Sequence, residues 1–79
     1  MADNITVEFT IEPFVDGALP AYVTAAVEAL EAMGITAVVG PFGTAVTATP
    51  AQVGPAVGAV LAAAYANGAT HVSIDSGRL

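Results

Sequence analysis

The chain has 79 residues, no Cys, one His, one Arg and no Lys, and its formal net charge is −6 at pH 7. These counts exclude disulfides and thiolate metal sites, and they disfavour nucleic acid as a partner because no basic patch is present to meet phosphates. Hydrophobic residues make up 56% of the sequence, which is high for one small domain and predicts that some apolar surface meets another subunit.

A membrane span has to be considered, because no Asp, Glu, Lys or Arg occurs between Glu31 and Asp75. The longest apolar stretch, residues 53–66, falls short of the roughly 20 residues that cross a bilayer. The first residues lack both the basic segment and the apolar core of a signal peptide. We therefore expect residues 1–79 to form a single cytoplasmic domain that does not contact a membrane.

The first predicted element is a strand over residues 5–12, which read ITVEFTIE and alternate strictly between apolar and polar side chains. The apolar side carries Ile5, Val7, Phe9 and Ile11, and the polar side carries Thr6, Glu8, Thr10 and Glu12. The chain has too few cations to neutralise the two carboxylates. Their counter-charge should therefore come from solvent, from a partner or from a cationic ligand.

An amphipathic helix is predicted next, after a turn at residues 14–17, with Pro20 in its first turn and Gly34 as its left-handed cap. Helical spacing places Val23, Ala26, Val27, Leu30 and Met33 on its inward side. Tyr22, like Tyr65 later in the chain, is expected on a helix surface or at an interface.

Two short strands, residues 35–39 and 44–48, are predicted to flank a turn at residues 40–43. Residues 49–52 read TPAQ, which is typical of a helix that begins with Thr49 at the N-cap and Gln52 closing a capping box. Pro55 removes one helical hydrogen bond and is expected to kink the first turns. The inward positions of this second helix are expected to be Val53, Val57, Val60, Leu61 and Ala64.

A last strand over residues 71–76 follows the helix stop at Asn67-Gly68, and its polar side carries His71, Ser73 and Asp75. The order βαββαβ predicts an α+β, ferredoxin-like sandwich with an antiparallel sheet in the order 4-1-3-2 and two helices on one face. In that sheet the first and last strands are neighbours. We expect Glu12 opposite His71, Thr10 opposite Ser73 and Glu8 opposite Asp75, with the loop aromatics Phe14 and Phe42 near the same end.

Two segments, residues 8–13 (EFTIEP) and 40–44 (GPFGT), resemble the signature of the YkoF-like thiamine- and hydroxymethylpyrimidine-binding family. The resemblance extends to the βαββαβ order of essentially the whole chain. It implies protomers that assemble through their sheets and bind thiamine or its pyrimidine moiety without catalysis. Some members carry two such repeats in one chain. This chain holds one, so an equivalent assembly requires at least a homodimer, with a homotetramer as the other possibility.

The candidate ligand-binding residues are polar, aromatic or glycine positions, expected on the sheet face away from the helices, toward one end of the sheet and near the subunit interface. They are Glu8, Thr10, Glu12, Phe42, Gly43, Thr44, His71 and Ser73. Thiamine presents a cationic thiazolium, an aminopyrimidine and flat rings, which carboxylates, hydroxyls and aromatics can meet. The alternative for Glu8 and Glu12 is that they are solvated residues on an exposed sheet face, and Thr10 and Ser73 could simply favour strands.

Two classes of function stay open. The first is a non-catalytic binding protein for a small cationic or heteroaromatic ligand, namely unphosphorylated thiamine or hydroxymethylpyrimidine, with no further cofactor and no metal. The second is an oligomeric regulatory or assembly module that senses another small molecule. An enzyme is not expected, because no residue is spaced in the sequence to act as a nucleophile with His71.

Overall fold

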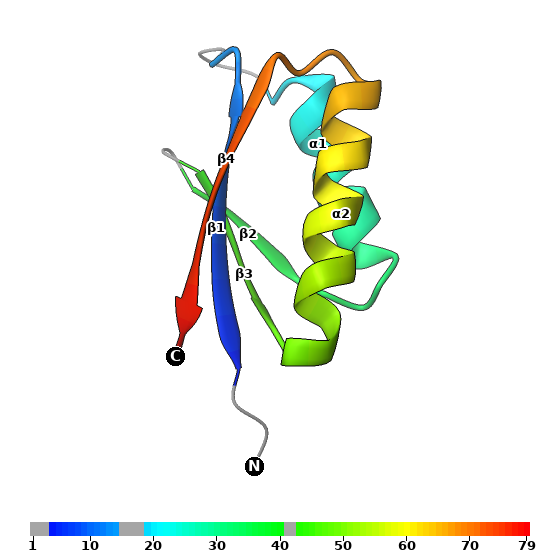
Figure 1. The fold of residues 1–79 in the computed structure, drawn as a ribbon. Coiled ribbons are helices and arrows are strands. Elements are labelled where there is room, and N and C mark those ends of the chain that lie inside the picture. Colours follow the sequence, from blue (N-terminus) through cyan, green and yellow to red (C-terminus); the bar gives the residue numbers. More distant parts are fainter. Residues whose placement is uncertain (1–3, 15–18, 41–42) are drawn as a thin grey trace.

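The computed structural model describes residues 4–14, 19–40 and 43–79. The elements follow in the order β1 (Ile5–Glu12), α1 (Ala21–Glu31), β2 (Ala37–Gly40), β3 (Gly43–Ala48), α2 (Pro50–Ala66) and β4 (His71–Arg78). The strands form one antiparallel sheet in the order β2-β3-β1-β4, and both helices lie on the same side of it (Figure 1). This is the ferredoxin-like α+β sandwich that the sequence predicts.

The register between β1 and β4 is the one expected from the alternation of polar residues. Glu12 pairs with His71, Thr10 with Ser73 and Glu8 with Asp75. At the end where β4 begins, the backbone N–H and the hydroxyl of Thr70 both donate to the carbonyl oxygen of Glu12, at 2.8 and 3.2 Å. These bonds fix the start of β4 against the end of β1, so the polar rows of the two strands lie side by side.

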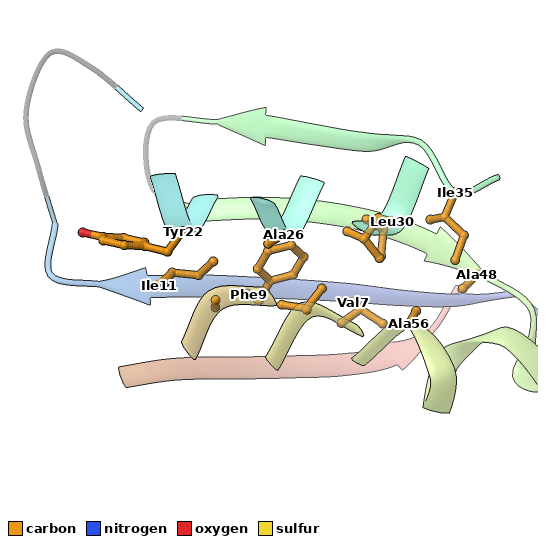
Figure 2. Packing of buried hydrophobic residues seen from close by; sticks show 12 residues of the cluster. Val7, Phe9, Ile11, Tyr22, Ala26, Leu30, Ile35, Ala48 and Ala56 are labelled. Atoms are coloured by element: carbon orange, nitrogen blue, oxygen red, sulfur yellow. The ribbon is translucent and has the colours of Figure 1, made fainter. Parts of the chain in front are cut away.

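The core lies between the sheet and the helices, and Val7, Phe9 and Ile11 of β1 belong to it together with residues of both helices (Figure 2). Leu30 of α1 is fully buried there. Three alanines of the helices, Ala26, Ala56 and Ala64, are 0–2% exposed. Small buried side chains allow close packing, so a chain this short still encloses a continuous apolar layer.

Tyr22 is buried rather than on the helix surface, which corrects the expectation from the sequence. Pro20 is the N-cap of α1, and the buried positions of this helix are Tyr22, Ala26 and Leu30. The phenol is 7% exposed and its hydroxyl donates to the carbonyl oxygen of Pro13, which follows a cis peptide bond. Burial of the ring is possible because the hydroxyl has this partner. Tyr65 is exposed, as expected.

The ends of the helices follow the local signals in the sequence. Gly34 and Gly68 have φ angles of +76° and +101°, the left-handed conformation that glycine adopts without strain. At the start of α2, the Gln52 side-chain oxygen accepts from the Thr49 backbone N–H at 3.0 Å. The helix continues through Pro55 to Ala66. None of the described helices is both long and apolar enough to cross a membrane.

Four strand boundaries and the inward side of α2 differ from the prediction. β2 ends at Gly40 and β3 begins at Gly43, each one residue closer to the turn than expected. β2 begins at Ala37, because Ile35 packs into the core at 3% exposure before the strand starts, and β4 continues to Arg78. The buried positions of α2 are Ala56, Val60 and Ala64. The expected inward residues Val53, Val57 and Leu61 are only half-buried. In a helix this rich in Ala and Val, the apolar pattern alone does not fix which side packs on the sheet.

Candidate functional site

The side of the sheet away from the helices, here called the open face, is where the polar residues of β1 and β4 lie (Figure 1). Register and strand alternation place the following side chains on it: Thr6, Glu8, Thr10 and Glu12 of β1, Val38 of β2, Ala45 and Thr47 of β3, and His71, Ser73 and Asp75 of β4. Neither helix covers this face. It is therefore the accessible surface to which the sequence assigns the site.

A hollow of about 460 Å³ lies on the open face, and all four strands contribute to its lining. Glu8, Thr10, Ser73 and Asp75 line one part of it, and Val38, Gly40, Gly43 and Ala45 line the other. Small-molecule sites in proteins typically measure about 300–1,000 Å³ and combine an apolar wall with a few polar groups. The hollow has that size and that composition.

Two carboxylates oppose each other in this hollow. Glu8 and Asp75 are directly paired across β1 and β4, and both are exposed. Like charges in this position repel each other, so a cation bound between them would be stabilised and would relieve the repulsion. The only Arg of the chain, Arg78, pairs with Ile5 at the opposite end of β1 from Glu12. The electrostatics of the hollow thus favour a positively charged ligand.

Two hydroxyls lie beside the carboxylates, because Thr10 pairs with Ser73 one position further along the same face. The Ser73 Oγ is 3.2 Å from the Nε2 of His71. The alternation of the predicted last strand already placed His71 and Ser73 on the same side. Residues two apart on a strand share a face, and that shared face brings the imidazole and the hydroxyl within hydrogen-bonding distance. The hollow therefore has hydroxyls able to donate or accept.

Glu12 and His71 are neighbours at the end of the sheet, but neither lines the hollow. Both side chains are exposed. Phe42, the aromatic expected beside them, lies outside the described residues, and Phe14 is 63% exposed. The end of the sheet thus adjoins the hollow without forming its lining.

Gly43 and Thr44 reach the hollow in different ways from the polar residues. Thr44 pairs with Phe9, so its side chain points to the helix side, and it is 5% exposed. It can meet a ligand on the open face only through its backbone. A Cβ at Gly43 would lie 3.1 Å from both the Phe9 carbonyl oxygen and the Thr10 Cγ2. Glycine here allows β3 to approach β1 closely at the edge of the hollow.

Six of the described lining residues were not among the candidates from the sequence: Phe9, Val38, Gly40, Ala45, Ile74 and Asp75. Asp75 could have been included, because the predicted register already placed it opposite Glu8. Val38 lies in an apolar strand, and Ala45 lies in a strand of Thr, Ala and Val without strict alternation, so the sequence did not indicate which face they occupy. Among the described residues, no group of three or more His, Asp or Glu side chains is arranged to hold a metal ion.

The profile of the thiamine-binding protein family matches residues 7–75 of the chain. The chain belongs to this family. A binding role for a small molecule agrees with that membership and with the hollow on the open face. No curated protein matches the sequence.

Solved structures with the same architecture include two that cover nearly the whole chain. One is a domain of unknown function from Bacillus cereus, with a TM-score of 0.69 and 19% identity over 99% of this chain and 76% of that one. Another is a proposed thiamine biosynthesis or salvage protein from Thermotoga maritima, with a TM-score of 0.66 and 22% identity over 95% of this chain and 81% of that one. At such identities the likeness shows the shared fold.

Proposed function

We propose that this protein binds unphosphorylated thiamine, or its hydroxymethylpyrimidine moiety, in the hollow on the open face and does so without catalysing a reaction. The observation that carries the proposal is the opposed pair of carboxylates, Glu8 and Asp75, in a hollow of about 460 Å³ on a member of the thiamine-binding protein family. The proposed contacts are Glu8, Asp75 and the hydroxyls of Thr10 and Ser73.

The chemistry of thiamine supports this assignment. The thiazolium carries a fixed positive charge that two carboxylates attract, and the amino group of the pyrimidine can donate to them. The ring nitrogens of the pyrimidine accept hydrogen bonds, which hydroxyl groups can supply. The exposed side chain of Val38 provides an apolar wall for a ring. Gly43 and Thr44 can contribute backbone groups, while Glu12 and His71 are proposed to act from the adjoining end of the sheet. Phe42 stays a proposed ligand contact from the sequence.

Self-association is part of the proposal. The hollow is open to solvent on a face that no helix covers, and a second copy stacked on this face would enclose a ligand between two sheets (Figure 1). Val38, which is 67% exposed, supplies apolar area for that contact. We propose a homodimer, or a homotetramer built from two dimers, acting in the cytoplasm.

Titration calorimetry with thiamine, hydroxymethylpyrimidine and thiamine diphosphate tests the proposed function. Thiamine should bind best, and the diphosphate should bind more weakly because its phosphates approach two carboxylates. Thiamine affinity should fall modestly as salt is raised, since one ligand charge is involved. Equal or tighter binding of the diphosphate would contradict the role of the carboxylates, and no heat with any of the three would contradict the proposed ligand class.

A further inference from the structure

The hydrogen bond between His71 and Ser73 links a residue outside the hollow to one that lines it. The Nε2 of His71 is 3.2 Å from the Ser73 Oγ, and only Ser73 contributes to the lining. We propose that His71 is a positioning residue that sets whether the Ser73 hydroxyl donates or accepts a hydrogen bond in the hollow. This inference rests on the proposed function, because it takes the ligand to lie in the hollow.

The argument follows from the single proton of a hydroxyl group. When Nε2 carries a proton, it donates to the Ser73 Oγ, and the hydroxyl proton of Ser73 is free to be donated to a ligand. When Nε2 carries no proton, it accepts the Ser73 hydroxyl proton, and only the lone pairs of the oxygen face the ligand. The proton on one nitrogen of His71 therefore reverses the role of the Ser73 hydroxyl, 3.2 Å away.

The hollow is rich in acceptors, which makes the donor role the useful one. The carboxylates of Glu8 and Asp75 accept hydrogen bonds and can serve an amino group or a cation. Of the described side chains in the lining that face the hollow, the donors are the hydroxyls of Thr10 and Ser73. A ring nitrogen of a heteroaromatic ligand needs such a donor, so we expect the Nε2-protonated form of His71 to be the binding form.

The charged groups around this pair come from β1 and β4. Glu12 lies directly opposite His71, Asp75 follows Ser73 on the same face of β4, and Glu8 lies opposite Asp75. The residues that β3 places on this face, Ala45 and Thr47, are uncharged. A neutral ligand is the better probe here, because a protonated imidazole would repel the positive charge of thiamine. That repulsion would be measured together with the effect of the hydrogen bond.

The chain has one His, so a single imidazole gives the nitrogen signals in an NMR spectrum of the whole protein. Hydroxymethylpyrimidine, which carries no fixed charge, is the probe. At saturation the Nε2 signal of His71 should be that of a nitrogen that carries a proton. Calorimetry at the same pH should find that Ser73→Ala binds hydroxymethylpyrimidine about three- to tenfold more weakly than wild type, the range of one neutral hydrogen bond.

Variants at exposed positions of β4 separate this role from a structural one. Ser73→Ala should lose this share of the affinity, and its His71 signal should not respond to the ligand. Ser73→Thr keeps a hydroxyl and should retain both effects. Ser76→Ala is the matched control, because Ser76 pairs with Val7 and belongs to the other side of the strand. It should behave as wild type.

The outcomes distinguish the two proposals. Binding with an Nε2 that carries no proton, or an equal affinity in wild type and Ser73→Ala, overturns the role of His71 and leaves the proposed function intact. Absence of binding of both hydroxymethylpyrimidine and thiamine overturns the proposed function and, with it, this role of His71.

Discussion

Glu8 and Asp75 are two exposed carboxylates held opposite each other by the pairing of β1 with β4. An exposed like-charged pair of this kind typically costs between about 0.2 and 1 kcal/mol. The strands would lose nothing in packing if one of the two were neutral. The pair is therefore more readily understood as a feature of binding than of folding, because a cation between the carboxylates turns the repulsion into attraction.

The substitution Glu8→Gln tests this role. It removes the repulsion and keeps the shape of the side chain, so the protein without ligand should gain stability, with a melting temperature higher by up to a few degrees. Thiamine binding should weaken at the same time. Melting curves of both proteins with and without thiamine measure the two effects together, and their opposite signs are the expected result.

Glu28→Gln is the matched control for that substitution. Glu28 lies exposed on α1, on the side of the sheet away from the hollow, and Glu31 is three residues further along the helix. The change alters the net charge by the same amount and relieves a comparable like-charge contact. It should leave thiamine binding unchanged. If Glu8→Gln binds thiamine as well as wild type does, Glu8 is a solvated strand residue and the site lies elsewhere.

At the scale of the element, α2 shows how local hydrogen bonds set the limits of a helix. The Gln52 side-chain oxygen lies 3.0 Å from the Thr49 backbone nitrogen and 3.1 Å from the Thr49 Oγ1, and both groups can donate to it. Asn67, at the other end, donates its side-chain N–H to the carbonyl oxygen of Ala63 at 2.8 Å. These bonds satisfy groups that a helix end leaves without intrahelical partners.

The start of α2 gives a prediction in which two substitutions act in opposite directions. Gln52→Ala removes the acceptor and should lower the free energy of unfolding by about 0.5–1.5 kcal/mol. Gln52→Glu keeps acceptor oxygens and adds a negative charge in the first turn, where the helix dipole favours it by about 0.3–1 kcal/mol. Urea unfolding should rank Gln52→Glu at or above wild type and Gln52→Ala below it. An unchanged midpoint for Gln52→Ala would show that water replaces the bond.

At the scale of the whole molecule, the sandwich is one-sided, because both helices cover the same side of the sheet and the other side stays open (Figure 1). Small domains bury a limited share of their surface. Because one face of the sheet is uncovered, this domain has a single apolar core on the other face. Stacking a second copy on the open face would bury apolar area and enclose the hollow. The shape of the protomer thus favours association through the face that holds the candidate site.

Sedimentation equilibrium tests this association directly. At micromolar concentration the protein should have at least twice the 7.8 kDa mass of one chain. Val38→Glu places a charge on the open face and should shift the equilibrium toward the monomer. Tyr65→Glu makes a similar change at a residue that is 51% exposed on α2, and it should leave the mass unchanged. A wild-type protein that sediments as a monomer would remove the interface from the proposal.

The sequence by itself determined the features that depend on neighbouring residues. Strict alternation placed Glu8, Thr10 and Glu12 on one side of β1, and Gly34 marked a helix end, because strand and helix periods and left-handed glycines are local properties. The order of the elements then limited the fold to one sheet topology. That topology, together with the polar rows of β1 and β4, was enough to predict the register between them.

Only the tertiary structure decided the features that depend on how the elements pack. Tyr22 is buried because α1 begins after Pro20 and turns the phenol toward Pro13, where a carbonyl oxygen accepts its hydroxyl. Val38 joins the hollow because the pairing of β2 with β3 sets its face, and an apolar strand without alternation does not reveal that face. Burial and shared faces arise from contacts between residues far apart in the chain, so the local pattern alone could not specify them.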